Sequence, residues 1–346
     1  MQRVGLPTAK HIAAELGVSQ STISRAFTKD ASISAEMRAK VMEAAGKAGY
    51  TPNAIARSLI TRRSGIVGIV MADLTNPFYP EVLEALTNRL QRDDLHTLLF
   101  NVPEGHEVDE ALPLVLQYQV DAVVITSATL SSRMAKTCAA RGTPVVLLNR
   151  HVPGSGVHAV ACDNYLAGRT VARFLAERGH KRMAYVAGKS DTATNIDREK
   201  GFVDQLAELG MSLWGRAGDE DYTHDAGYRA ALQLLGREQK PDAIFFANDI
   251  LAIGGIDAIR GVAGLSIPRD ISVVGFDNIR MAEWPSYNLT TVRQPIAEMA
   301  ERTGDILAKF YGGKPSKPKV HLIHGDLIER GSTVDRRKTK AAKGER

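Results

Sequence analysis

The chain has 346 residues, of which 44% are hydrophobic and 24% are charged, and its formal net charge is +5. This balance is that of an ordinary water-soluble globular protein, and the length suits a small module joined to a larger two-lobed domain. No run approaches the roughly 18 apolar residues that a membrane span needs, and the first ten residues lack the apolar stretch of a signal peptide. We therefore expect a cytoplasmic protein with no membrane partner.

The positive charge is concentrated at the two ends of the chain. Residues 1–63 hold ten Lys or Arg and four Asp or Glu, a net charge of +6, and residues 330–346 hold seven and two, a net charge of +5. The residues between them carry a net charge of −6. A basic N-terminal segment on an acidic body indicates a polyanionic partner for that segment. The basic tail has no apolar periodicity and is expected to be disordered.

Three short helices are predicted in the first 50 residues. Thr8 and Ser19 are suitable N-caps for helices over residues 9–16 and 20–27, and a third helix is expected over residues 34–48. A short turn that contains glycine joins the first two helices, as in a helix-turn-helix. A small helical bundle with a polar face would show the same spacing, so the pattern alone leaves both interpretations open.

The second helix begins with short polar side chains, Gln20, Ser21 and Thr22, followed by Ser24 and Arg25. In a helix-turn-helix, the first residues of the second helix enter the major groove of DNA. Amide, hydroxyl and guanidinium groups hydrogen-bond there to base edges and phosphates. These side chains are therefore candidates for DNA contacts.

Two segments carry a family resemblance. Residues 8–26 (TAKHIAAELGVSQSTISRA) and 49–59 (GYTPNAIARSL) resemble the N-terminal signature and the hinge of the lactose-repressor family of bacterial regulators, and the resemblance continues through almost the whole chain. Thr28 departs from the family, which commonly has Asn there, so no contact is assigned to it. The resemblance implies operator contacts by Thr8, Ser19, Gln20, Ser21, Thr22, Ser24, Arg25, Asn53, Ala56 and Leu59.

The hinge follows Pro52, and Asn53 can cap a short helix that extends to about Thr61. So short a helix is not stable alone in water, and we expect it to form only on DNA and beside a second subunit. In the family, a leucine of each hinge helix wedges between base pairs in the minor groove, and Leu59 occupies that position. Without the resemblance, an ordinary helix contact would be the preferred interpretation of Leu59.

Beyond Gly65, short apolar runs alternate with amphipathic stretches, which indicates an α/β domain with parallel sheets whose strands are buried on both faces. Strands are predicted at residues 66–71, 96–100, 122–125, 145–148, 157–161, 183–187, 243–246 and 272–276. Helices are predicted at residues 80–92, 166–178, 198–209, 226–235 and 251–259.

Polar and aromatic residues follow several of these strands, at the edge where ligands of parallel sheets bind. They suit a polyhydroxylated ligand, although Asn and Asp also cap helices, and Asp249 could do only that. The resemblance implies an effector cleft lined by Phe78, Asn149, Arg198, Tyr222, Asn248, Asp277 and Gln294, with Asn76 and Arg150 as neighbours.

The resemblance also implies a periplasmic-binding-protein-like domain with two lobes, chain crossovers near residues 163, 290 and 322, and a homodimer or higher oligomer on a pseudo-palindromic operator. The predicted organisation is a helix-turn-helix domain at 1–51 and a hinge and linker at 52–64. A two-lobed effector-binding and dimerisation domain follows at 65–330, and a disordered tail at 331–346.

No cofactor, metal or catalytic pattern is recognised. The nine histidines lack metal-ligand spacing, and the two cysteines, Cys138 and Cys162, are too far apart in sequence for a Cys-x-x-Cys motif and are expected to be buried. Residues 154–159 loosely match a dinucleotide-binding motif but lead into a strand instead of the required helix.

We therefore expect a sequence-specific transcriptional repressor, not an enzyme, whose operator affinity is controlled by a small molecule bound between two lobes. Arg150 and Arg198 favour a sugar or sugar acid, while a purine-type corepressor remains an alternative. A solute-binding protein would need a signal peptide and would have no use for residues 1–61. A sugar-processing enzyme would need a catalytic pair in the cleft.

Overall fold

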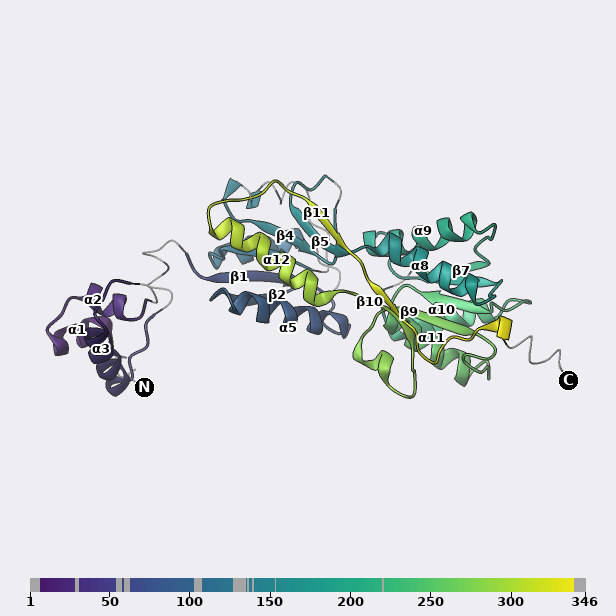
Figure 1. Ribbon diagram of the computed structural model, residues 1–346, viewed down its shortest axis with the longest axis horizontal. Helices are drawn as coiled ribbons and strands as arrows, with labels where there is room; N and C mark the ends of the chain where they lie inside the picture. The colour runs from purple at the N-terminus through teal and green to yellow at the C-terminus, as the bar shows by residue number, and fades with distance from the viewer. Residues whose placement is uncertain are drawn as a thin grey trace. The chain divides into compact units, whose positions relative to one another are not determined.

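The computed structural model describes residues 7–28, 31–53, 58, 63–102, 108–126, 135, 137–138, 140–152, 154–219 and 221–338. The chain divides into two compact units, residues 1–65 and 66–346, which are taken separately below (Figure 1). In the described part of the chain, no helix is long and apolar enough to cross a membrane. Ala56 and Leu59 of the predicted hinge lie outside the described residues.

The N-terminal unit consists of three helices, α1 (Ala9–Leu16), α2 (Gln20–Ala26) and α3 (Ala35–Ala48). Ile12, Ile23 and Val41, one from each helix, are at most 1% exposed and form the centre of its small core. The helix ends follow the local sequence. The Ser19 and Ser34 hydroxyls accept backbone N–H groups in the first turns of α2 and α3, and Gly17 and Gly49 end α1 and α3 in the left-handed conformation.

One polar contact joins α3 to the end of α2. The Arg38 guanidinium donates to the carbonyl oxygens of Ala26, at 2.6 Å, and Thr28, at 3.1 Å. These carbonyls lie at the C-terminus of α2, where backbone acceptors lack helical partners and a cation is favoured. Arg38 therefore holds α2 against α3 without occupying the exposed face of α2.

The first lobe of the larger unit contains a sheet with strand order β11-β5-β4-β3-β1-β2, in which all pairs are parallel. On one face of this sheet, α5 and α12 pack against Val67, Ile69 and Met71 of β1, and on the other face α6 packs near Val70. Both faces of β1 are thus buried, which explains its unbroken apolar sequence. The elements are β1 (Ile66–Met71), α5 (Phe78–Gln91), β2 (His96–Asn101), α6 (Val108–Gln117), β3 (Ala122–Ile125), β4 (Val145–Leu148), β5 (His158–Cys162), α12 (Ile296–Tyr311) and β11 (Val320–Ile323).

The second lobe contains a sheet with strand order β12-β10-β9-β8-β6-β7, parallel except for the edge pair β10–β12. Its core is centred on the aromatic side chains of Tyr185, Phe202, Phe245 and Phe246, which are all fully buried. The elements are α8 (Asn164–Glu177), β6 (Met183–Ala187), α9 (Ala193–Glu208), β7 (Gly215–Gly218), α10 (His224–Leu235), β8 (Ala243–Phe246), α11 (Asp249–Gly261), β9 (Ser272–Asp277), the short 3₁₀ helix η1 (Arg280–Glu283), β10 (Thr290–Arg293) and β12 (Asp326–Ile328).

The chain passes between the two lobes three times. It leaves the first sheet after Cys162, returns between Arg293 and Ile296, and leaves again between Ile323 and Asp326. These crossovers lie close to the positions implied by the family resemblance. As a result, α12 packs against α5, although more than 200 residues separate them in the sequence (Figure 1).

Two helix pairs of the second lobe approach closely because glycines line their contacts. A Cβ atom at Gly168 of α8 would lie 2.2 Å from the Arg198 carbonyl oxygen, and one at Gly201 of α9 would lie 2.0 Å from the Tyr165 carbonyl oxygen. The same arrangement recurs between α10 and α11, where a Cβ atom at Gly254 would lie 1.9 Å from the His224 carbonyl oxygen. Side chains larger than hydrogen would force these helices apart.

The structure differs from the sequence prediction in several elements. The sequence did not predict α6, β7, η1, β10, α12, β11 or β12, and α9 begins at Ala193 instead of residue 198. The earlier start has a local cause, because the Thr192 hydroxyl accepts the Asn195 N–H at 3.4 Å and caps the helix.

The predicted disordered tail is wrong for residues 331–338. The Ser332 hydroxyl donates to the Val273 carbonyl at 2.6 Å and accepts the Thr290 N–H at 2.8 Å. Arg336 donates to the Asp270 carbonyl at 2.6 Å. The segment is ordered by hydrogen bonds to the second lobe, which hydrophobic periodicity does not detect. Residues 339–346 lie outside the described residues.

We expect Gly201→Ala to destabilise the larger unit by about 1–3 kcal/mol, because the new methyl group overlaps the α8 backbone. Gly261→Ala is the matched control, since a Cβ atom there meets nothing within 4 Å. It should be neutral or slightly stabilising. Urea unfolding of the full chain measures both, and equal midpoints for the two variants would contradict the close-packing argument.

Candidate functional site

The first candidate site is the exposed face of α2. Gln20, Ser21, Ser24 and Arg25 are exposed on this face, while Ile23 is fully buried against the other helices. The Arg25 Nε donates to the Ser21 carbonyl at 3.3 Å, so its guanidinium lies beside the Ser21 side chain. The structure therefore presents a contiguous set of hydroxyl, amide and guanidinium groups, as a helix that reads DNA requires.

The remaining predicted DNA contacts that the structure describes lie at helix starts or in the hinge. Thr8 and Ser19 are exposed N-cap residues, and the backbone N–H of Thr8 donates to His11 Nδ1 at 3.3 Å. Thr22 is half-buried, with its N–H donated to the Ser19 hydroxyl at 3.2 Å. Asn53 is exposed at the end of the described hinge.

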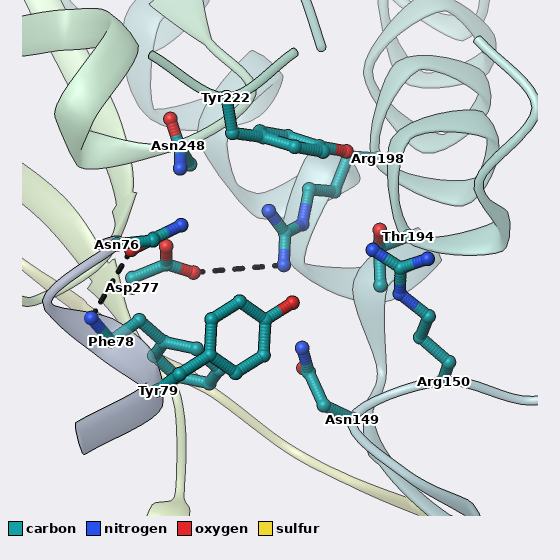
Figure 2. Close-up of a pocket in the computed structure, with 10 residues that line it drawn as sticks. All are labelled: Asn76, Phe78, Tyr79, Asn149, Arg150, Thr194, Arg198, Tyr222, Asn248 and Asp277. Atoms are coloured by element: carbon teal, nitrogen blue, oxygen red, sulfur yellow. Dashed lines mark hydrogen bonds and ion pairs between the residues drawn. The ribbon is translucent and has the colours of Figure 1, made fainter. Parts of the chain in front are cut away.

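The second candidate site is a pocket between the two lobes of the larger unit (Figure 2). The first lobe contributes residues that follow β1 and β4, and the second lobe contributes residues from α9, from the segments after β7 and β8, and from the end of β9. The lining residues are Asn76, Phe78, Tyr79, Asn149, Arg150, Thr194, Arg198, Tyr222, Asn248 and Asp277.

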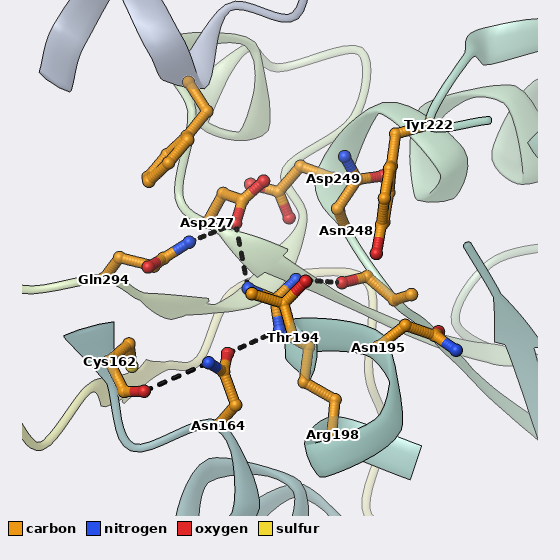
Figure 3. Close-up of polar contacts among 12 residues, drawn as sticks. Cys162, Asn164, Thr194, Asn195, Arg198, Tyr222, Asn248, Asp249, Asp277 and Gln294 are labelled. Carbon is orange, nitrogen blue, oxygen red and sulfur yellow. Dashed lines mark hydrogen bonds and ion pairs between the residues drawn. The ribbon is translucent and has the colours of Figure 1, made fainter. Parts of the chain in front are cut away.

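Arg198 is the centre of a buried polar network (Figure 3). Its guanidinium donates to Asn164 Oδ1 at 2.8 Å and to the Ala247 carbonyl at 2.5 Å, and it lies 3.7 Å from Asp277 Oδ1. It also lies over the ring of Phe276, 3.5 Å from the ring centroid. These contacts compensate the desolvation of a side chain that is only 3% exposed.

Gln294 donates its Nε2 to Asp277 Oδ1 at 2.7 Å (Figure 3). It does not line the pocket, although the family resemblance implies that it does. Its hydrogen bond fixes the Asp277 carboxylate, and Gln294 itself lies in the segment where the chain crosses back to the first lobe. Burial raises the pKa of Asp277 to about 6, against the opposing effect of the Arg198 charge.

Asp249 follows a pocket residue but faces away from the pocket. Its carboxylate accepts the Thr291 hydroxyl at 2.6 Å and the Ile279 N–H at 2.9 Å, and burial raises its pKa well above the ordinary value. The proposed capping role of Asp249 is wrong, since the side chain of Asn248 is the N-cap of α11 and accepts the Leu251 N–H at 3.0 Å.

Tyr222 occupies the pocket wall because Gly188 leaves room for it. A Cβ atom at Gly188 would lie 2.2 Å from the tyrosine ring. The Tyr222 hydroxyl is held at 3.0 Å from the Thr192 hydroxyl, at the N-cap of α9. The aromatic face and the helix that carries Arg198 are thus positioned by neighbouring residues.

Several lining or adjacent residues adopt backbone conformations that are rare for side chains other than glycine. Asn149 has φ of 70°, Asp277 has 118° and Asn278 has 60°. Such residues cost about 1–3 kcal/mol each and persist where the surrounding structure holds them, often at functional sites. Here they turn the chain sharply at the ends of β4 and β9, which brings Asn149 and Asp277 to the pocket.

All the predicted effector residues line the pocket except Gln294, which donates a hydrogen bond to the lining residue Asp277. Tyr79 and Thr194 also line the pocket, although the family resemblance did not assign them to the cleft. Their signal was present, because both are polar residues that follow predicted strands.

Both predicted free cysteines are buried, and burial raises the pKa of Cys162 to about 12. No cluster of three or more potential metal ligands occurs among the described residues.

The raised pKa of Asp277 predicts a pH-dependent stability. Because the folded protein holds this proton more tightly than the unfolded chain, the stabilisation is present below the ordinary pKa of 3.8 and is lost as the pH rises through about 6. The free energy of unfolding of the wild type, relative to Asp277→Asn, should fall by about 2–3 kcal/mol between pH 4 and pH 7.5. Urea titrations across this range measure the difference. A constant difference would contradict the shift, since the attraction of Arg198 acts only on the ionised carboxylate and is already part of the Asp277 pKa.

Comparisons with known proteins identify the family of both units. The profile described as "Bacterial regulatory proteins, lacI family" matches residues 8–53, and that described as "Periplasmic binding protein-like domain" matches residues 172–333. A lac repressor dimer bound to operator and to the anti-inducer ONPF has the same fold, with a TM-score of 0.85, 24% identity, and coverage of 95% of this chain and 100% of that one. A complex of the transcriptional regulator CelR with cellobiose has a TM-score of 0.71 and 28% identity, over 94% of this chain and 99% of that one.

Curated relatives align over nearly the full length. The HTH-type transcriptional regulator GalS of Salmonella typhimurium is 30% identical, over 94% of this chain and 96% of that protein. The HTH-type transcriptional repressor PurR of Erwinia tasmaniensis is 31% identical, over 95% of this chain and 98% of that protein. With its helix-turn-helix unit, its two-lobed domain and these relatives, the chain belongs to the lacI family of bacterial regulatory proteins.

Proposed function

We propose that this DNA-binding transcriptional regulator is a repressor, and that a small polyhydroxylated molecule in the pocket between the lobes controls its affinity for the operator. One observation carries the proposal: the pocket combines polar groups of both lobes with aromatic faces. Asn76, Asn149 and Arg150 come from the first lobe, and Arg198, Asn248 and Asp277 from the second. Such a mixture of hydrogen-bonding and aromatic groups suits a sugar or sugar acid.

Control by ligand follows from the position of the pocket. A molecule that bonds to both lobes stabilises one angle between them over others, and it can shift an equilibrium only by its difference in affinity for the two states. Because the hinge leads directly into β1 of the first lobe, a change in lobe angle within a dimer would change the spacing of the two hinges. We propose a homodimer on a pseudo-palindromic operator, in the cytoplasm, with no enzymatic role.

Two solved structural neighbours support a sugar-type ligand. The CelR structure contains cellobiose, and a LacI family regulator from Enterococcus faecium, 25% identical with a TM-score of 0.70, contains bound ribose. A flat purine-type corepressor is the second candidate, because Phe78, Tyr79 and Tyr222 line the same pocket. The two candidates predict opposite selectivity in a binding screen.

The ligand is identified by a thermal-shift screen of the purified chain against sugars, sugar acids, polyols and purines. Each hit is then tested for its effect on operator affinity. We expect a sugar or sugar acid to raise the unfolding temperature and to change operator affinity, because a ligand that binds only the folded state stabilises it. Stabilisation by purines alone would replace the sugar-type ligand with the second candidate.

Arg25→Ala should weaken specific operator binding by roughly 10- to 100-fold, as expected for loss of a guanidinium contact to a base edge. Ligand binding should not change. Lys47→Ala is the control, because it removes the same charge from an exposed position near the end of α3. Titrations of operator and non-specific DNA at one salt concentration measure both variants. Equal losses in the two variants would mean that Arg25 contributes only general charge.

A further inference from the structure

We propose that the effector carries an oxyanion, a carboxylate or a phosphate, beside its hydroxyl groups, and that Arg150 binds this oxyanion. The inference rests on the proposed function, since it concerns the ligand of the same pocket. It narrows the ligand from sugars in general to anionic sugar derivatives.

The first argument is the balance of charge in the pocket. Its lining contains two guanidinium groups, Arg150 and Arg198, and one carboxylate, Asp277. Arg198 and Asp277 lie 3.7 Å apart. Arg198 also bonds to Asn164 and to a backbone carbonyl, and Asp277 accepts from Gln294. The charges of this pair offset each other, and the charge of Arg150 is left over.

The second argument is the environment of Arg150 itself. No hydrogen bond or ion pair joins its side chain to another residue in the described ranges, and its Nε atom is buried without an acceptor. A buried donor that lacks an acceptor is destabilising, and guanidinium groups are suited to bind carboxylates and phosphates through two parallel hydrogen bonds. An oxyanion in the pocket would supply the missing acceptor.

Acids near this side of the pocket already have basic partners. Asp221, next to Tyr222, lies 3.1 Å from Lys189 Nζ, and Asp197 lies 3.9 Å from His151 Nε2. The hydrogen bond from Lys189 to Asp221 raises the pKa of this lysine, and the nearby positive charge of Arg150 acts in the opposite direction and lowers it. The acids on this side of the pocket are thus paired with other cations, and none of them forms an ion pair with Arg150 among the described residues, which favours an anionic ligand there.

Asn149 adds a matching acceptor for a neutral part of the ligand. It is 4% exposed, and its Oδ1 atom has no hydrogen-bond partner among the residues that the structure describes. Figure 2 shows Asn149 and Arg150 along one side of the pocket, with Asp277 on the other side of Arg198. An oxyanion beside Arg150 would therefore lie away from Asp277, and a hydroxyl of the same molecule could donate to Asn149. A hydroxyl next to an anionic group is the arrangement found in sugar acids and sugar phosphates.

The test is calorimetric titration of the full chain with matched compounds in three arms. The neutral arm contains D-glucose, D-galactose and D-glucitol. The carboxylate arm contains D-gluconate, D-glucuronate and D-galacturonate, and the phosphate arm contains the 6-phosphates of glucose and galactose. We expect at least one anionic compound to bind roughly tenfold or more tightly than its neutral counterpart. The arm in which it occurs identifies the oxyanion as carboxylate or phosphate.

Three variants assign the preference to Arg150. Arg150→Met should abolish the preference for the anion, Arg150→Lys should retain part of it, and Arg269→Met, which removes a charge that is 77% exposed, should leave it unchanged. An unfolding midpoint and an operator affinity without ligand that match the wild type establish that Arg150→Met is folded.

The possible failures are distinct. If neutral sugars bind as tightly as their anionic counterparts, or if Arg150→Met keeps the preference, the inference is overturned and the proposed sugar-type regulator stands. If no compound of the three arms binds while the operator is still bound specifically, the inference and the proposed sugar-type ligand are both overturned.

Discussion

The larger unit depends on the burial of one guanidinium group. Arg198 is carried by α9 and is satisfied by groups from three other places in the chain: Asn164 at the first crossover, the Ala247 carbonyl after β8, and Asp277 at the end of β9. Gln294, at the second crossover, holds Asp277 in turn. A buried charge of this kind is tolerated only when all these partners are in place, so the network ties the pocket to the segments that connect the lobes.

Close helix packing places this charge. Because Gly168 and Gly201 allow α8 and α9 to touch backbone to backbone, Arg198 lies within hydrogen-bonding distance of Asn164. The rare backbone conformations of Asn149 and Asp277 then direct their side chains into the same pocket. The site therefore combines small residues, which permit close approach, with sharp turns at strand ends, which expose polar groups.

The two arginines of the pocket differ in what they do. Arg198 donates two buried hydrogen bonds and lies 3.7 Å from Asp277, whereas the Nε atom of Arg150 has no acceptor among the described residues. Because no described residue accepts from this Nε atom, and Arg150 lies on the lobe opposite to Arg198, a ligand bound to both arginines would connect the two lobes. The ligand would then stabilise one angle between the lobes through its charge at Arg150 as well as through its contact area with both lobes.

Local sequence determined the helix-turn-helix, the buried parallel strands and the polar residues at the strand ends, because caps, glycine stops and apolar runs act over a few residues. The buried strand at residues 66–71 and the exposed polar face of α2 could both be predicted in this way. The convergence of residues as distant as Asn76 and Asp277 could also be expected, since the carboxyl ends of parallel strands face one edge. Only the tertiary structure decided that α12 returns to the first lobe and that residues 331–338 pack on the second lobe. It also decided that Gln294 donates a hydrogen bond to Asp277, and that Asp249 accepts the Thr291 hydroxyl. The reason is that the direction of a side chain, and the order of a segment without apolar periodicity, depend on partners far away in the sequence.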